Sequence, residues 1–225
     1  MAERTKTQFQ QVSLADQAKD ALKKEIFSGA LKPGERIDIS EYAKRWAISP
    51  TPLRDALKNL EVSGIVEVSP RRGVFVAKLD ERAFREILDL RICLEPAAVR
   101  LAAPNIPREV AEAARDAYLN AGNARPEDRV AALEEVDFLI HRLAKEYCGN
   151  SRLKRMLESA WDQFQWSRHA IIWKVEVPFD LTLPEHIRIC ECLIKGDGAC
   201  AETAMRQHLE HSRKRLSSNT HGVDT

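Results

Sequence analysis

The sequence predicts a mainly α-helical protein in two parts: a small N-terminal part that includes a β-hairpin, and a larger C-terminal bundle made only of helices. Three observations lead to this prediction. Hydrophobic residues recur at helical spacing along most of the 225 residues. Two short β-rich runs, residues 65–68 and 73–76, flank the turn-forming sequence Ser-Pro-Arg-Arg. After the second run, only helical patterns occur, and Gly or Pro separates them.

Composition restricts the class of protein. Hydrophobic residues make up 44% of the chain and charged residues 31%, which is typical of a soluble globular protein with a core. No apolar run approaches the roughly 18 residues of a membrane span, and the N-terminus lacks the apolar stretch of a signal peptide. We therefore expect a cytoplasmic protein with no membrane partner. Its five cysteines are an odd number without CxxC spacing, so we expect free thiols rather than a disulfide framework.

The charge is unevenly distributed along the chain. Residues 1–79 hold 14 Lys and Arg against 10 Asp and Glu, whereas the remaining residues hold 21 against 24. A basic front and a mildly acidic back favour a module that faces a polyanion, joined to a second module of different function.

The N-terminal part begins with an amphipathic helix over residues 14–27, because Leu14, Ala18, Leu22 and Ile26 recur at helical spacing. Gly29 ends this helix.

Two further helices and a hairpin complete the N-terminal part. Ser40 is expected to cap a short helix that runs through Trp46. Ser49 suits the N-cap and Pro50 the first position of a third helix, which ends near Val62. Helix, helix–turn–helix and hairpin, in that order within about 65 residues, predict a winged helix-turn-helix domain over residues 1–79.

The C-terminal part is predicted to be an all-α helical bundle over residues 80–217. Its helices are expected at residues 80–103, 107–121, 127–148, 151–173, 182–195 and 198–216, with breaks at Gly and Pro. A polar tail, residues 218–225, follows.

The start of the third helix is the candidate for reading DNA, because a helix-turn-helix inserts the N-terminus of its second helix into the major groove. Ser49 and Thr51 are short hydroxyl donors suited to a phosphate or a base edge, and Arg54 can pair with guanine. Arg71 and Arg72 occupy the hairpin tip, where a minor groove or a phosphate would attract them. The alternative is a simple cap, a solvated arginine and an ordinary turn.

The residues of this segment also match a known family. The matches are Leu31-x-Pro33-Gly34-Glu35-Arg36, Ser49-x-Thr51-Pro52-Leu53-Arg54-Asp55-Ala56-Leu57, Leu60-Glu61-x-x-Gly64 and a wing that contains Gly73. With them, residues 31–77 resemble the winged-helix domain of GntR-type bacterial transcriptional regulators. The resemblance implies binding of double-stranded operator DNA through Ser49, Thr51, Arg54, Arg71, Arg72 and Gly73.

Two positions depart from the family pattern. Pro50 stands where the family usually carries Arg, and Ser40 stands where a second Arg is frequent. The operator sequence therefore cannot be predicted from the resemblance.

Four residues of the helical part form a candidate metal site. Asp137 and His141 are four apart, so they are expected on one face of one helix. His186 and His208 each lie 11 residues from Asp197, which centres the turn between two late helices. In an antiparallel pair, equal distance from the turn places both side chains at one height, roughly 16 Å from the loop.

One carboxylate and three imidazoles suit a borderline divalent cation. Zn²⁺ is the expected ion, and Ni²⁺, Co²⁺ or Mn²⁺ are alternatives. The other interpretation is a hydrogen-bonded Asp–His pair with two unrelated core histidines. Trp161, Trp166 and Trp173 are interpreted as core packing rather than as a stacking box.

Residues of about 80–216 resemble the all-helical effector domain of the FadR subfamily, called the FCD domain. Its metal-binding members carry Asp-x-x-x-His on one helix and single histidines on two late helices, and the matching residues here are Asp137, His141, His186 and His208. The resemblance implies that Arg91 pairs with an effector carboxylate. The alternative for Arg91 is a structural i,i+4 pair with Glu95.

Together these features predict a homodimeric regulator that binds a two-fold operator and senses a small organic acid through its metal-containing helical domain. Family resemblance favours a repressor. The alternatives are a metal-dependent hydrolase with a DNA-binding appendage and a direct metal sensor. The chain is expected not to be an enzyme, since it has no HExxH sequence and no general base beside the proposed ligands.

Overall fold

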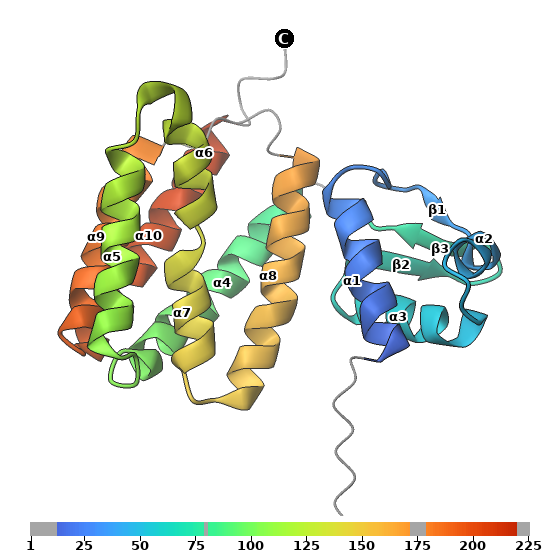
Figure 1. Ribbon diagram of the computed structural model, residues 1–225, viewed down its shortest axis with the longest axis horizontal. Helices are drawn as coiled ribbons and strands as arrows, with labels where there is room; N and C mark the ends of the chain where they lie inside the picture. Colours follow the sequence, from blue (N-terminus) through green and yellow to red (C-terminus); the bar gives the residue numbers. More distant parts are fainter. Residues whose placement is uncertain (1–12, 79–80, 172–178, 220–225) are drawn as a thin grey trace, which may run out of the picture. The chain divides into compact units, whose positions relative to one another are not determined.

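The computed structural model describes residues 13–78, 81–171 and 179–219. The chain divides into two compact units, Met1–Lys78 and Leu79–Thr225. Figure 1 shows the small unit with its sheet and the larger unit made of helices. The predicted class, a winged helix-turn-helix followed by an all-α bundle, is confirmed. Trp173 lies outside the described residues.

The N-terminal unit combines three helices with a small antiparallel sheet. The helices are α1 (Leu14–Phe27), α2 (Ile39–Arg45) and α3 (Pro50–Val62), and the strands are β1 (Arg36–Ile37), β2 (Val66–Ser69) and β3 (Gly73–Val76). The strand order is β1-β3-β2, and Ser69 pairs with Gly73 where the wing closes. Helix α1 packs on α3, and their facing side chains Leu22, Ile26, Leu53 and Leu57 are buried.

Two local predictions for this unit were wrong or incomplete. Asp38, not Ser40, caps α2: its Oδ1 accepts hydrogen bonds from the amides of Ser40 at 2.8 Å and Glu41 at 3.1 Å. A carboxylate at the positive end of a helix can accept hydrogen bonds from two amides at once. The N-cap therefore lies at Asp38, two residues before the predicted Ser40. Strand β1 was not predicted, because two residues are too few to show alternation.

The C-terminal unit consists of seven helices within the described ranges. They are α4 (Glu81–Ala102), α5 (Arg108–Gly122), α6 (Pro126–Val136), α7 (Leu139–Tyr147), α8 (Ser151–Ile171), α9 (Phe179–Ile194) and α10 (Gly198–Asn219). The single helix expected over residues 127–148 is therefore two helices. The predicted start of the tail at residue 218 lies inside α10, and residues 220–225 are outside the described part. Pro184, expected as a break, lies within α9.

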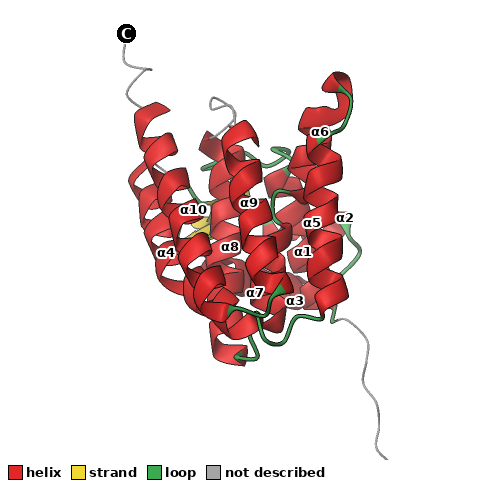
Figure 2. Ribbon diagram, turned by 90° about the vertical axis from the view of Figure 1, so that its left-hand side faces the viewer, coloured by secondary structure: helices red, strands yellow, loops and turns green. Residues whose placement is uncertain are grey.

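Helix α4 packs along α10, α7 and α8, while α9 packs between α5 and α10. Figure 2 shows α4 and α10 side by side. Their close approach depends on small residues: a Cβ on Gly198 would lie 2.6 Å from the Arg100 carbonyl oxygen.

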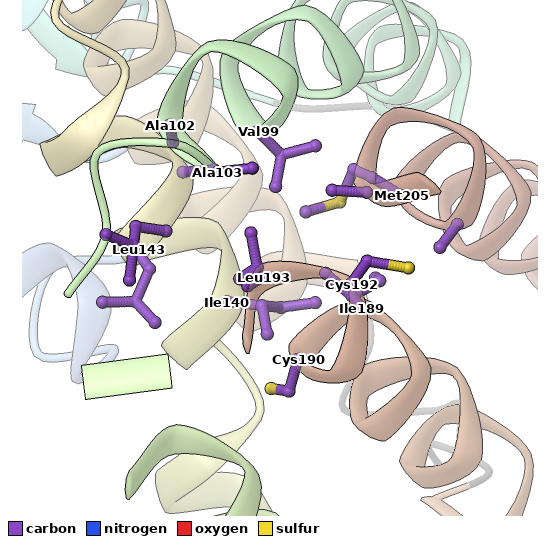
Figure 3. Close-up of a cluster of buried hydrophobic side chains, with 14 of the residues drawn as sticks. Val99, Ala102, Ala103, Ile140, Leu143, Ile189, Cys190, Cys192, Leu193 and Met205 are labelled. Atoms are coloured by element: carbon purple, nitrogen blue, oxygen red, sulfur yellow. The ribbon is translucent and has the colours of Figure 1, made fainter. Parts of the chain in front are cut away.

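The core of the bundle lies between these helices. Figure 3 shows the side chains of Val99, Ile140, Ile189, Leu193 and Met205 gathered from four helices. Each fully buried side chain of this size contributes about 1.5–3 kcal/mol to stability. Helices α7, α9 and α10, which carry His141, His186 and His208, are thereby held on one core.

The expectation of five free thiols was wrong for one pair. Cys192 on α9 and Cys200 on α10 form a disulfide, whereas Cys93, Cys148 and Cys190 are free. The tight turn between α9 and α10 brings the Cα atoms of the pair to 5.5 Å, within the usual range for a disulfide.

Candidate metal centre and nucleic-acid interface

Three histidines from three helices meet inside the C-terminal unit. His141 lies on α7, His186 on α9 and His208 on α10, and all three side chains are buried. Each offers a ring nitrogen, and the three nitrogens lie within 4.8 Å of one another. The interpretation of His186 and His208 as unrelated core residues is therefore wrong.

The spacing of the nitrogens suits one shared ion. The Nε2 atoms of His186 and His208 are 3.4 Å apart. Two nitrogens at that separation, each about 2.0–2.1 Å from one Zn²⁺, would subtend about 110°, close to the tetrahedral angle. The three histidines thus form a group that could hold a divalent metal.

A carboxylate outside the predicted set orients His208. Glu185 on α9 lies 2.9 Å from Nδ1 of His208 and 2.8 Å from Nδ1 of His211, and it also pairs with Arg215. Because Nδ1 of His208 then donates to Glu185, its Nε2 lone pair is left for a metal. Burial raises the pKa of Glu185, but hydrogen bonds from His208 and His211 outweigh burial and lower it.

A second buried network orients His141. Its Nδ1 contacts the carboxylate of Glu95 and lies 3.3 Å from Nη2 of Arg91. Nε of Arg91 in turn donates to Glu95 at 2.5 Å. Burial raises the pKa of Glu95, yet the charges of Arg91 and His141 outweigh it and hold the pKa well below its ordinary value. Glu95 therefore stays ionised. Because Nδ1 of His141 faces Glu95, Nε2 of the same ring is directed away from Glu95 and Arg91.

Arg91 is enclosed by these partners. Its side chain is 3% exposed, and its guanidinium carbon lies 3.9 Å from the ring centroid of Phe164 and 5.1 Å from that of Trp161. The structural Arg91–Glu95 pair, the alternative considered from the sequence, is present. The pairing of Arg91 with an effector carboxylate stays a prediction.

The environment keeps two of the imidazoles neutral. Burial, reinforced by the charges of the neighbouring histidines, lowers the pKa of His186 well below its ordinary value. Burial also lowers the pKa of His208, against the opposing hydrogen bond from Glu185. A neutral imidazole is the form that binds a metal, so the two side chains are ready to act as ligands at neutral pH.

The structure does not bring Asp137 into the group of three histidines. Asp137 is half-buried at the C-cap of α6, so it does not share a helix with His141, which lies on α7. Tyr118 of α5 spans the break between the two helices: its hydroxyl accepts from the Ile140 amide at 3.2 Å and donates to the Asp137 carbonyl at 3.5 Å. The Tyr118 ring also lies 4.9 Å from the ring of His186.

A cavity of about 460 Å³ opens beside the histidines. It is lined by Glu95, Glu135, Val136, Phe138, Leu139, His141, Arg142, Lys145, Leu157, Trp161 and Gln165. Its volume lies within the usual range for small-molecule sites. Trp161 thus lines a cavity as well as packing against Phe138 and Phe164, whereas Trp166 is buried as expected.

The predicted DNA-reading residues of α3 are all on the surface. Ser49, Thr51 and Arg54 are exposed at the N-terminus of the helix. Ser49 occupies the N-cap, but its side chain makes no capping hydrogen bond, because Pro52 removes an amide that it would normally accept from. Within the described residues, Arg54 makes no ion pair.

The wing presents the other predicted contacts. Arg71 and Arg72 are exposed in the turn, with Arg71 at a φ of 64°. The Arg72 guanidinium carbon lies 5.8 Å from the Phe75 ring centroid. Gly73 has a φ of 118°, and a Cβ there would lie 3.1 Å from Nε of Arg36. Gly73 thus shapes the turn that carries both arginines.

Comparison with known proteins identifies both units. Residues 86–211 match the FCD domain, and residues 14–76 match the bacterial regulatory proteins of the gntR family. The chain belongs to the GntR family and carries an FCD domain. The predicted family, a GntR-type regulator with an FCD domain, is therefore confirmed.

Relatives of this GntR–FCD chain are transcriptional regulators. The chain is 29% identical over 198 residues to the uncharacterized HTH-type transcriptional regulator YdhC of Bacillus subtilis (strain 168), covering 87% of each protein. It is 29% identical over 197 residues to the HTH-type transcriptional repressor GlaR of Escherichia coli (strain K12), covering 84% of this chain and 89% of GlaR. The chain is thus a regulator of transcription and not an enzyme, and the hydrolase alternative is wrong.

A solved structure shares the fold. The structure of E. coli McbR/YncC superimposes with a TM-score of 0.74 at 22% identity, covering 93% of this chain and all of that one. Separately, none of the helices described here combines the length and the apolar character needed to cross a lipid bilayer.

Two residues beside the histidine group, Glu185 and Tyr118, were not predicted from the sequence. A sequence signal for Glu185 was available. His208, His211 and Arg215 recur on one face of α10, and such a cluster of basic side chains indicates a nearby carboxylate partner. No local signal marked Tyr118, since its hydroxyl acts on a helix break that is 19 residues further along.

Proposed function

We propose that this GntR–FCD protein is a homodimeric repressor that leaves its operator when a small organic acid binds beside a metal ion in the FCD domain. Three features support the proposal: the exposed DNA-reading residues of α3 and the wing, the buried histidine group, and the cavity that shares His141 with this group. The histidine group is the observation that carries this proposal. Without a metal centre, the domain would need another way to bind the carboxylate of an acid.

The metal would be held by His141, His186 and His208, with Asp137 as the fourth ligand implied by family resemblance. Zn²⁺ is the expected ion, and Ni²⁺, Co²⁺ or Mn²⁺ are alternatives. When bound, the ion supplies a Lewis-acidic position for a carboxylate oxygen. Glu185 and Glu95 hold two of the imidazoles in the orientation that leaves Nε2 for the ion.

The effector would enter through the cavity. Its apolar wall includes Phe138, Leu157 and Trp161, which suits a short carbon chain, and His141 lies on its lining. The predicted pairing of Arg91 with the effector would require that Arg91 share its guanidinium with Glu95. A ligand can act only through its different affinity for the DNA-binding and released states.

A homodimer is supported by a row of apolar residues on α4. Leu90, Leu94, Ala97 and Leu101 follow one another at spacings of four, three and four, so they share one helix face. Leu90 is 40% exposed and Leu101 45% exposed, although both are large and apolar. A second copy packed against this face would bury the row and present two winged helices to a two-fold operator in the cytoplasm.

The DNA-binding half is tested with Arg54→Ala. If Arg54 reads a base, the variant should lose about 1–3 kcal/mol of binding free energy for the promoter beside its own gene. Fluorescence anisotropy with labelled duplex measures this loss, and wild-type binding should fall steeply with salt. Arg108→Ala, an exposed arginine on α5, serves as the control. An Arg54→Ala variant that binds as tightly as the control would contradict the assignment.

A further inference from the structure

The lining of the cavity carries positive charge that the histidine centre does not use. Arg142 and Lys145 lie on α7, directly after His141, and both line the cavity. His141 and Lys145 are four residues apart, so they lie on the same face of the helix, about 6 Å apart along its axis. The lining of the cavity therefore includes both His141 of the histidine centre and a pair of cationic side chains.

The two cations are available to a ligand. Across the described ranges, Arg142 makes no ion pair and Lys145 pairs only with its exposed neighbour Glu146, at 3.6 Å. Arg142 is exposed, while the Lys145 side chain is 21% exposed. Both ammonium and guanidinium groups can thus turn toward an anion in the cavity.

The acidic residues of the lining do not cancel this charge. Glu95 is already neutralised by Arg91 and faces His141. Glu135 is exposed and is the other carboxylate of the lining. The lining therefore carries two cations, Arg142 and Lys145, against one carboxylate other than Glu95.

Arg91 is a weaker candidate for this role. It is not among the residues described as lining the cavity, and Glu95, Phe164 and Trp161 surround its guanidinium. A ligand carboxylate would have to share the Arg91 guanidinium with Glu95. Arg91 instead positions Glu95, and through it His141.

We propose that Arg142 and Lys145 form an anion subsite, so that the effector carries two anionic groups, one at the histidine centre and one at this pair. The inference rests on the proposed function, because the first anionic group needs the metal at the histidine centre. Phe138, Leu157 and Trp161 of the same lining offer apolar surface for the carbon chain. The ligand class is therefore a short aliphatic or aromatic dicarboxylate rather than a monocarboxylate.

The test compares matched acids on the full-length Zn²⁺-loaded protein. Isothermal titration calorimetry measures the affinity of succinate and adipate, and of butyrate and caproate, which have the same carbon chains with one carboxylate. At least one dicarboxylate should bind the wild type about tenfold or more tightly than its monocarboxylate partner, the effect expected of a charge-assisted hydrogen bond.

Variants locate the source of the preference. In the double variant Arg142→Gln/Lys145→Gln, the ratio between the two acids should fall to about one, with monocarboxylate affinity unchanged. Glu135→Gln should strengthen dicarboxylate binding, because it removes a like charge. Arg152→Gln, an exposed arginine on α8 outside the cavity lining, should behave as the wild type.

The outcomes separate this inference from the proposed function. A wild type that binds both classes equally overturns the anion subsite alone, and so does a double variant that keeps the wild-type preference. A wild type that binds none of the four acids overturns the subsite and also counts against acid sensing in the proposed function. None of these results touches DNA binding or metal content. Loss of metal or of DNA binding by the wild type would instead refute the proposed function.

Discussion

At the scale of single residues, two carboxylates define how the buried imidazoles can act. Glu185 accepts a hydrogen bond from Nδ1 of His208, and Glu95 accepts one from Nδ1 of His141. Each fixes one tautomer, so the remaining nitrogen is an acceptor that can bind a cation. The partners of the histidines are therefore as much a part of the centre as the histidines themselves.

Replacing Glu185 should weaken metal binding. In Glu185→Gln, the imidazole of His208 loses its anionic acceptor, and zinc affinity should fall about 10–100-fold. Competition with a chromophoric chelator measures the affinity. Glu191→Gln, an exposed glutamate on the same helix, is the matched control. An affinity in Glu185→Gln equal to that of the control would show that Glu185 does not support the centre.

Tyr42 in the DNA-binding unit gives a prediction for alkaline pH. Its hydroxyl donates to Glu25 at 2.6 Å, and burial together with Glu25 raises its pKa to about 12. Because the folded pKa exceeds the unfolded value of about 10, the stabilisation is complete below pH 10 and is lost as pH rises toward 12. In Tyr42→Phe, the loss of unfolding free energy that comes from ionisation of Tyr42 should be absent.

Urea unfolding at a series of pH values from neutral to strongly alkaline measures the effect. The free energy of unfolding of the wild type should approach that of Tyr42→Phe as the pH rises. Parallel curves for the two proteins across this window would contradict the role of the Tyr42 hydroxyl.

At the scale of elements, the break between α6 and α7 is the feature that places His141 and Asp137, two of the proposed metal ligands. The sequence pattern over residues 127–148 continues without Gly or Pro, so it predicts one helix. The structure instead interrupts the helix, and the hydroxyl of Tyr118 satisfies the amide of Ile140 inside the core. A hydrogen bond to another helix thus replaces the i→i−4 hydrogen bond that the Ile140 amide would make in a continuous helix. The periodicity of residues 127–148 contains no sign of this bond.

Tyr118→Phe tests this arrangement. The change leaves the buried Ile140 amide without its acceptor, which should cost about 1–3 kcal/mol of unfolding free energy. Because the break also sets the positions of Asp137 and His141, zinc affinity should fall as well. Chemical denaturation and chelator competition measure the two effects.

Tyr147→Phe is the comparison, since the described contacts of Tyr147 include no hydrogen bond to its hydroxyl. It should be close to the wild type in both measurements. If Tyr118→Phe matches Tyr147→Phe, the break is held by other contacts.

Other elements were predictable because their signals are local. The periodicity of α1, the Ser49–Pro50 start of α3 and the hairpin all lie within one short window of sequence. The cap of α2 failed because Asp38 and Ser40 are both good caps, and only the folded backbone shows which one faces the amides.

At the scale of the whole molecule, the sequence predicted the convergence of His186 and His208 from their equal distance to the α9–α10 turn. His141 joined them through family resemblance and its place among core residues. The cavity and the two cations of its lining could not be predicted, because they depend on how α6, α7 and α8 pack around Trp161. The spacing of residues along a helix shows which side chains share one face of that helix. A cavity depends instead on how the faces of several helices pack together.

In the proposed function, the helical domain controls the DNA-binding domain. The two units are linked thermodynamically if a ligand of one changes the affinity of the other, and typical coupling is about 5–150-fold. A ligand bound equally well by both states would change nothing. Coupling therefore has to be measured on the full-length protein.

The most direct measurement is the affinity of the Zn²⁺-loaded protein for its own promoter, with and without a panel of small mono- and dicarboxylates, alongside His186→Ala/His208→Ala. At least one acid should weaken DNA binding by the wild type fivefold or more, while the double variant should bind DNA without responding to any acid. A double variant that responds like the wild type, or a wild type that responds to zinc alone and to no acid, would contradict the account.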